Sequence, residues 1–129
     1  MRKRKTKGQI EAEISEAIIK FEKEYMGRGP LETKTYIIDD IVLVRLKGVM
    51  TKAEMHLADT ERELRGRGLV KEVRIELLEK GRSLLEDVIL KITGRKVISL
   101  HTDISTKTGE RVIIFTLDGS LSDSPGEKT

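Results

Sequence analysis

Apolar positions near the start of the chain repeat with the spacing of a helix. One stripe is formed by Ile10, Ile14, Ala17, Ile18, Phe21 and Tyr25. Charged residues occupy the remaining positions, as is typical of an amphipathic helix that packs on a core. Gly27 and Gly29 can adopt positive φ and Pro30 cannot continue a helix. We therefore predict that the helix ends at this Gly-Arg-Gly-Pro segment.

The pattern then changes to runs of β-branched and aliphatic residues. Two β-hairpins are predicted, at residues 35–46 and 97–117. The first turns at Asp39-Asp40, because Asp tolerates the backbone geometry of a tight turn.

A second helical region separates the two hairpins. Thr51 and Glu54 have the spacing of a capping box, which predicts a helix from Thr51 to about residue 64. A long helix is predicted at 69–93, ended by Gly94. Its buried side is expected to carry Val70, Val73, Leu77, Leu84, Leu85, Val88 and Ile92. The Arg-Gly-Arg-Gly segment at 65–68 is expected to be non-helical and to separate the two helices.

These elements follow the order α-β-β-α-α-β-β and predict an α+β fold. We expect a two-layer α/β sandwich with a largely antiparallel four-stranded sheet. The 129 residues suffice for one domain, predicted at 9–118. A basic flexible tail is expected at 1–8, and a disordered tail rich in Ser, Asp and Gly at 119–129.

Composition narrows the function classes. The absence of Cys excludes disulfides and thiolate chemistry, and it fits a reducing cytoplasm. No apolar run approaches the roughly 20 residues of a membrane span, so we expect a soluble, cytoplasmic protein. Charged residues make up 36% of the chain, a composition that leans towards thermophiles. No cofactor is expected.

The excess positive charge lies at the N-terminus. Arg2, Lys3, Arg4, Lys5 and Lys7 supply it, whereas residues 8–117 carry equal numbers of basic and acidic side chains. Such a tail suits an anionic membrane surface, nucleic acid or an acidic partner, and it also suits a simple solubilising extension.

Two Gly-basic segments are candidates for binding an anion or a partner. The first contains Arg28. The second has more basic neighbours and is the preferred surface, formed by Arg62, Arg65, Arg67 and Arg74. Neither segment has the pattern of a phosphate-binding loop. As turns both segments need no ligand, and this is the favoured interpretation because Gly is the usual residue at helix ends.

His101 and Asp103 lie two apart on a predicted strand, so their side chains leave the same face, beside Ser99. Nothing nearby indicates a strained nucleophile turn or an oxyanion hole, so we expect no catalysis here. His56 has neither a second His at the spacing of a helical metal site nor a carboxylate cluster beside it, so no metal is expected.

Both faces of the predicted sheet carry apolar side chains. Ile41, Leu43, Val112 and Ile114 occupy the face opposite to the one that the helices cover. An apolar sheet face left in water is unusual, so we expect a homodimer that buries this face or the long helix.

The order Gly-basic-Gly-Pro, hairpin, Leu-x-Gly-x-x-Thr-x-x-Glu resembles the MpsC-like family, long catalogued as a domain of unknown function. The resemblance extends from about residue 9 to residue 117. The positions that carry it are Gly27, Gly29, Pro30, Leu46, Gly48, Thr51, Glu54, Arg74 and Gly94. Most of them have structural explanations as turns and caps.

The resemblance implies a non-enzymatic accessory or regulatory protein. At family level it implies association with a sodium-translocating, membrane-potential-generating system tied to inorganic-carbon uptake, whose other components are the membrane proteins. Two alternatives stay open: a small RNA-binding protein, for which the aromatic stacking platform is sparse, and a small-molecule-binding domain near His101.

Overall fold

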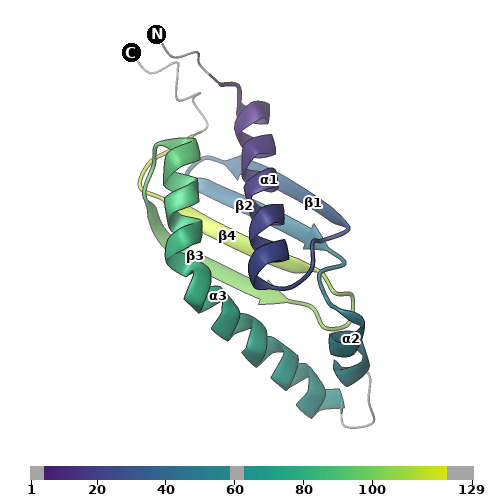
Figure 1. Cartoon of the computed structure of the whole chain (residues 1–129). Helices are drawn as coiled ribbons and strands as arrows, with labels where there is room; N and C mark the ends of the chain where they lie inside the picture. Colours follow the sequence, from purple (N-terminus) through teal and green to yellow (C-terminus); the bar gives the residue numbers. More distant parts are fainter. Residues whose placement is uncertain (1–4, 59–62, 122–129) are drawn as a thin grey trace.

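The computed structural model describes residues 5–58 and 63–121, and its elements follow the predicted order (Figure 1). The helices are α1 (Lys7–Tyr25), α2 (Lys52–Ala58) and α3 (Glu63–Thr93). The strands are β1 (Glu32–Ile38), β2 (Ile41–Lys47), β3 (Val97–Ile104) and β4 (Arg111–Leu117). The predicted α+β class is confirmed, with the helices packed against a four-stranded antiparallel sheet.

Helix α1 starts earlier than the predicted domain boundary. Thr6 is its N-cap and forms a capping box with Gln9, in which each side chain accepts from the other residue's backbone N–H. Neither residue was recognised as a cap from the sequence. At the other end, Gly27 has φ 84°, a conformation that favours glycine and ends the helix as predicted.

The two predicted hairpins are adjacent in one sheet of order β1-β2-β4-β3. Strand β1 pairs with β2 through a turn in which Asp39 has φ 57°. Strand β4 pairs with both β2 and β3. The central β2–β4 contact therefore joins the two halves of the sequence, and β1 and β3 are the edges.

Helix α3 differs from the prediction at its start. The predicted break at 65–68 was wrong, because α3 begins at Glu63 and runs through these residues. A helical Gly costs about 1 kcal/mol relative to Ala, a preference weak enough for tertiary contacts to override. Such a contact is present here, since α2 packs against α3.

The buried stripe of α3 also differs from the predicted one. The side chains that face the core are Val70, Arg74, Leu78, Leu85 and Ile89. Val73 and Leu84, which were expected on the buried side, are exposed. Gly81 lies where α1 crosses, and a Cβ atom there would collide with the ring of Phe21.

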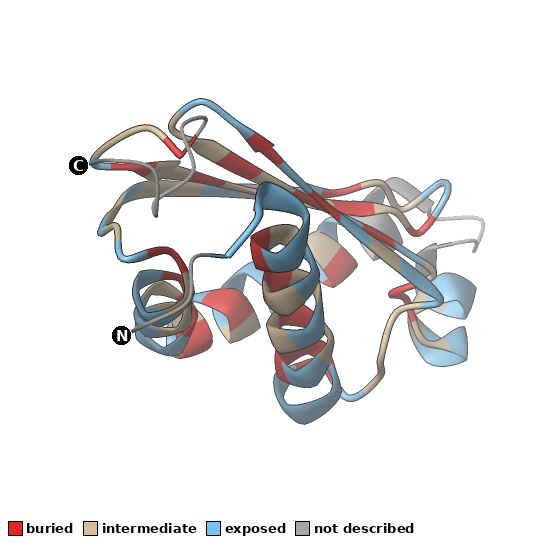
Figure 2. Ribbon diagram, turned by 90° about the horizontal axis from the view of Figure 1, so that it is seen from above, coloured by how far each residue is buried: buried red, intermediate tan, exposed pale blue. Residues whose placement is uncertain are grey.

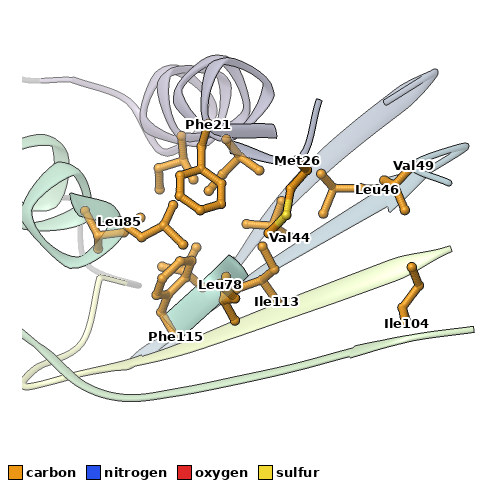
Figure 3. Packing of buried hydrophobic residues seen from close by; sticks show 14 of the residues in the cluster. Phe21, Met26, Val44, Leu46, Val49, Leu78, Leu85, Ile104, Ile113 and Phe115 are labelled. Carbon is orange, nitrogen blue, oxygen red and sulfur yellow. The ribbon is translucent and has the colours of Figure 1, made fainter. Parts of the chain in front are cut away.

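The core is one layer between the helices and the sheet. Figure 2 shows the helices on one side of the sheet. In Figure 3, Phe21 of α1 and Leu85 of α3 lie above Phe115 of β4 in the same cluster. The folded body extends past the predicted boundary at 118, because Leu121 is buried in this core and its N–H donates to the Asp39 carbonyl over 2.8 Å.

Candidate functional site

Four charged side chains from separate elements meet between the helices and the sheet. They are Glu22 of α1, Glu54 of α2, Arg74 of α3 and Arg111 of β4, and we call them the buried ion cluster. Glu22, Arg74 and Arg111 are 0%, 3% and 2% exposed. Charged groups are buried to this degree only when they are paired.

Arg74 is held on three sides. Its Nε and Nη2 donate to the two carboxylate oxygens of Glu54 over 3.0 and 2.6 Å, a bidentate arrangement. Nη2 also donates to the Val49 carbonyl over 2.7 Å, and Nη1 approaches Glu22 Oε1 at 3.5 Å. Arg74 therefore joins α3 to α2, to α1 and to the segment that follows β2.

Glu22 is shared by the two arginines. Its Oε2 accepts from Arg111 Nη1 over 2.9 Å, while its Oε1 faces Arg74. Arg111 Nε donates to Thr102 Oγ1 over 3.2 Å, which ties the cluster to β3. Two carboxylates and two guanidinium groups balance, so the buried ion cluster is neutral as a unit.

Burial and pairing act in opposite directions on the carboxyl groups. Burial raises the pKa of Glu22 above the ordinary glutamate value, and the charges of Arg111 and Arg74 oppose that shift. In Glu54, partial burial also favours the protonated form. The hydrogen bonds from Arg74 and Thr51 outweigh it, and they hold the pKa of Glu54 below its usual range.

The predicted capping box at the start of α2 is present. Thr51 N–H donates to Glu54 Oε1 over 2.9 Å, and Glu54 N–H donates to Thr51 Oγ1 over 3.1 Å. Arg28, predicted as an anion-binding residue, donates through Nη1 to the Met50 carbonyl over 3.1 Å. Arg28 and Arg74 thus fix two successive carbonyls, those of Met50 and Val49, next to this cap.

A small cavity adjoins the buried ion cluster. Its lining comprises Lys71, Arg74, Ile75, Thr102, Asp103, Ile104 and Arg111, and its volume is about 20 Å³. This volume accommodates roughly one water molecule, since a water needs about 10–15 Å³ measured in this way. The cluster itself connects α1, α2, α3 and β4.

The predicted basic surface is not assembled by the described residues. Arg74 is buried and paired. Arg65 and Arg67 lie within α3, but their side chains are outside the described part of the structure, and Arg62 is outside it altogether. The prediction for these three arginines stays a prediction.

His101 and Asp103 do lie on the same face of β3, as the alternation predicted, and both are exposed. The carboxylate of Asp103, however, contacts Lys71 Nζ at 3.2 Å and accepts from the Ile104 N–H over 2.8 Å. Its contacts therefore tie the edge of the sheet to α3 and give no orientation to the imidazole. In the stretches 5–58 and 63–121, no group of three or more His, Asp or Glu is placed to hold a metal ion.

One face of the sheet is left uncovered by the described helices (Figure 2). We call it the open sheet face. Its apolar residues are Tyr36, Ile38, Ile41, Leu43, Val112 and Ile114. Tyr36 and Ile38 are 41% and 57% exposed, and the other four are half-buried because they shield one another on the sheet. The four residues named from the sequence therefore do share this face.

A polar hollow of about 170 Å³ lies at one end of the open sheet face. It is lined by Glu32, Lys34, Tyr36, Arg45 and Lys47. Arg45 forms an ion pair with Glu110, which raises the pKa of this arginine. The face therefore combines an apolar area with a cationic end.

A second apolar surface follows α3. Leu69, Val73 and Leu84 are exposed there, and Val73 and Leu77 line a groove of about 300 Å³ with charged neighbours. None of the helices in the described stretches is long and apolar enough to cross a membrane.

The comparisons with known proteins agree with the sequence motif. Residues 6–119 match the family described as "Na+-translocating membrane potential-generating system (MpsC)". The chain belongs to the MpsC family. The resemblance predicted from the Gly-basic-Gly-Pro and Leu-x-Gly-x-x-Thr-x-x-Glu segments is confirmed.

Two relatives from Bacillus subtilis (strain 168) cover nearly the whole MpsC-family chain. "Uncharacterized protein YbcI" is 48% identical over 118 residues, which are 92% of this chain and 93% of the relative. "Uncharacterized protein YrhF" is 25% identical over 112 residues, 86% of this chain and 89% of the relative. No solved structure matches the chain significantly.

Two of the MpsC-family motif residues, Glu54 and Arg74, belong to the buried ion cluster. Glu54 is both the capping residue of α2 and the bidentate partner of Arg74. Gly48 has φ 69°, and a Cβ atom there would collide with Leu31. Gly94 has φ 75° after the end of α3. These positions therefore serve the geometry of the fold, as most of them were expected to do.

Sequence reasoning missed Glu22 and Arg111. Glu22 lies one turn after Ile18 on the apolar stripe of α1, and Arg111 has the same inward alternation as Ile113 on β4. A charge at a core-facing position is the signal that would have found each of them, because such a charge requires a buried counter-charge.

Proposed function

We propose that this MpsC-family chain is a non-enzymatic accessory protein that works by docking on other proteins through the open sheet face. The observation that carries the proposal is the uncovered apolar area of that face. Contiguous apolar area on a protein surface marks interaction sites. The charged groups in the interior are engaged with one another, beside a cavity the size of one water.

The family description supports the choice of partner. It names a membrane-potential-generating system that translocates Na+, and the described helices of this chain cannot span a membrane. The proposed role is therefore that of an accessory protein that lies at the membrane surface and docks on the membrane components.

The test measures flotation of the purified chain with vesicles. One set of vesicles carries the membrane proteins of such a system, and a second set contains anionic lipid alone. The chain is expected to float with the first set, and Leu43→Glu, which places a charge on the open sheet face, is expected to lose binding. Val73→Glu on α3 is the matched control and is expected to keep it.

Equal flotation with both sets, falling as salt rises, would mean that the chain binds lipid headgroups through its basic residues. Flotation with neither set, or equal binding by Leu43→Glu, would overturn docking through the open sheet face.

A specific observation favours RNA binding as the second candidate. Tyr36 lies exposed in the polar hollow beside Lys34, Arg45 and Lys47, which combines one stacking surface with cations. In this case single-stranded RNA should be retained at low salt, and Tyr36→Ala should weaken retention at every salt concentration. Retention that Tyr36→Ala leaves unchanged would exclude this face as an RNA platform.

A further inference from the structure

The open sheet face is organised in three rows that run across the strands. The first row is Ile38, Ile41, Thr116 and Ser99, and the second is Tyr36, Leu43, Ile114 and His101. The third row is Lys34, Arg45, Val112 and Asp103. The first two rows carry no Lys, Arg, Asp or Glu, and the third has a cation at the β1 edge and an anion at the β3 edge.

We propose that a second copy of this chain covers the open sheet face, related by a two-fold axis that runs parallel to the strands between β2 and β4. The inference goes beyond the proposed function, although both use the same face. This face cannot hold a second copy and another protein at once, so the dimer has to separate before the chain docks on a membrane protein.

Charge complementarity selects the axis. A two-fold rotation about this axis places each row on the same row of the other copy and exchanges the two edges, so β1 lies over β3. Lys34 then faces Asp103 of the partner subunit, and the reciprocal pair forms at the opposite edge. In the middle, Leu43 faces Ile114 of the partner subunit. Stacked sheets are about 10 Å apart, a spacing that long side chains such as Lys bridge.

The other face-to-face arrangement is unfavourable. An axis perpendicular to the strands would stack the third row of one copy on the first row of the other. Lys34 would then be desolvated against Ile38 without an opposite charge from the partner subunit, which is costly.

Pairing through sheet edges is also disfavoured on this chain. The β3 edge is irregular, because a register shift lies between Val97 and Ser99. Bulges of this kind protect a strand from adding to another sheet. The β1 edge carries Glu32 and Lys34, and charged side chains oppose edge-to-edge association in the same way.

The experiment measures molar mass by light scattering at micromolar concentration. The wild-type protein is expected at twice the 14.6 kDa of one chain. Leu43→Glu should be monomeric with an unchanged circular dichroism spectrum, because its side chain lies outside the core. Val73→Glu, on the exposed stripe of α3, is the matched control and should stay dimeric.

The charge pair tests the axis itself. Lys34→Glu and Asp103→Lys are each expected to raise the dimer dissociation constant on the order of tenfold, since like charges would then face each other. The double variant restores opposite charges and should return the constant towards that of the wild type. Lys71, which contacts Asp103 within one chain, is unaffected by Lys34→Glu, so that single variant reports on the interface alone.

Three results would overturn the proposal. They are a monomeric wild-type protein, a Leu43→Glu variant that stays dimeric, and a double charge variant that is no tighter than either single variant. A wild-type monomer that still floats with the membrane proteins would leave the proposed function standing. A dimer that floats with no vesicles would overturn the proposed function and leave the dimer intact.

Discussion

Replacing Glu22 by Gln is the sharpest perturbation of the buried ion cluster. The side chains have nearly the same shape, so packing is preserved while the shared negative charge is removed. Arg111 loses its carboxylate partner at 2.9 Å, and Arg74 loses one at 3.5 Å. Glu54 is then the remaining carboxylate of the cluster for two arginines, and the cluster carries an excess positive charge in the interior.

The expected cost is about 3–5 kcal/mol of unfolding free energy, the range for breaking a buried ion pair from one side. Domains of this size unfold with about 5–15 kcal/mol in total, so Glu22→Gln should bring the protein close to its stability limit. A double replacement, Glu22→Leu with Arg111→Met, removes both charges. It should recover part of the loss, because hydrophobic residues often replace a buried ion pair at little cost.

Urea unfolding at neutral pH, followed by circular dichroism, measures the difference. The matched control is Asp87→Asn, which removes an exposed carboxylate that pairs with Lys91 at 3.2 Å on the surface of α3. Surface pairs contribute roughly 0–1 kcal/mol, so the control should unfold nearly as the wild type does. If Glu22→Gln costs no more than Asp87→Asn, the buried ion cluster contributes no net stability and the reasoning is wrong.

Four further outcomes are expected. Thr51→Ala should cost about 1 kcal/mol of stability, seen as a lower urea midpoint, and leave flotation with the membrane proteins unchanged; lost flotation with normal stability would make Thr51 a binding residue. Because the pKa of Glu54 is lowered in the fold, its pairing with Arg74 contributes stability that is complete above the ordinary glutamate pKa and is lost as pH falls through the lowered one. The stability gap between wild type and Glu54→Gln should therefore close on acidification, and a gap independent of pH would contradict this. Removal of residues 1–4 should leave stability unchanged and weaken binding to anionic vesicles by about 1 kcal/mol per basic residue at low salt. Equal vesicle binding with and without residues 1–4 would make the tail a solubilising extension. Thr6→Ala, in contrast, should cost about 1 kcal/mol of unfolding free energy through loss of the α1 cap.

Local chemistry determined the elements of this protein. The β-branched runs predicted the second hairpin at 97–117, the span that β3 and β4 occupy in the structure, and Asp39-Asp40 predicted the first hairpin turn. The Thr51–Glu54 spacing specified the cap of α2. Periodicity, turn geometry and capping act within a few residues of sequence, so a single chain is enough to recognise them.

Prediction from the sequence was weaker where local preference and tertiary contact disagree. The Arg-Gly-Arg-Gly segment favours a break, yet α3 runs through it while packing against α2. Apolar periodicity placed Val73 and Leu84 on the buried side of α3, but both are exposed. Arg74 faces the core instead, because its charge is paired there with Glu22 and Glu54. The face that a helix buries depends on what the opposite surface offers.

The sequence by itself determined the family, the α+β class and the apolar character of both sheet faces. Tertiary structure alone decided that Glu22, Glu54, Arg74 and Arg111, separated by up to 89 positions in the chain, share one neutral cluster. It also decided that β2 pairs with β4, which sets the three rows of the open sheet face. The physical reason is the same in both cases: the energy of a buried charge or an exposed apolar side chain depends on its neighbours in space, and no spacing within one segment specifies those neighbours.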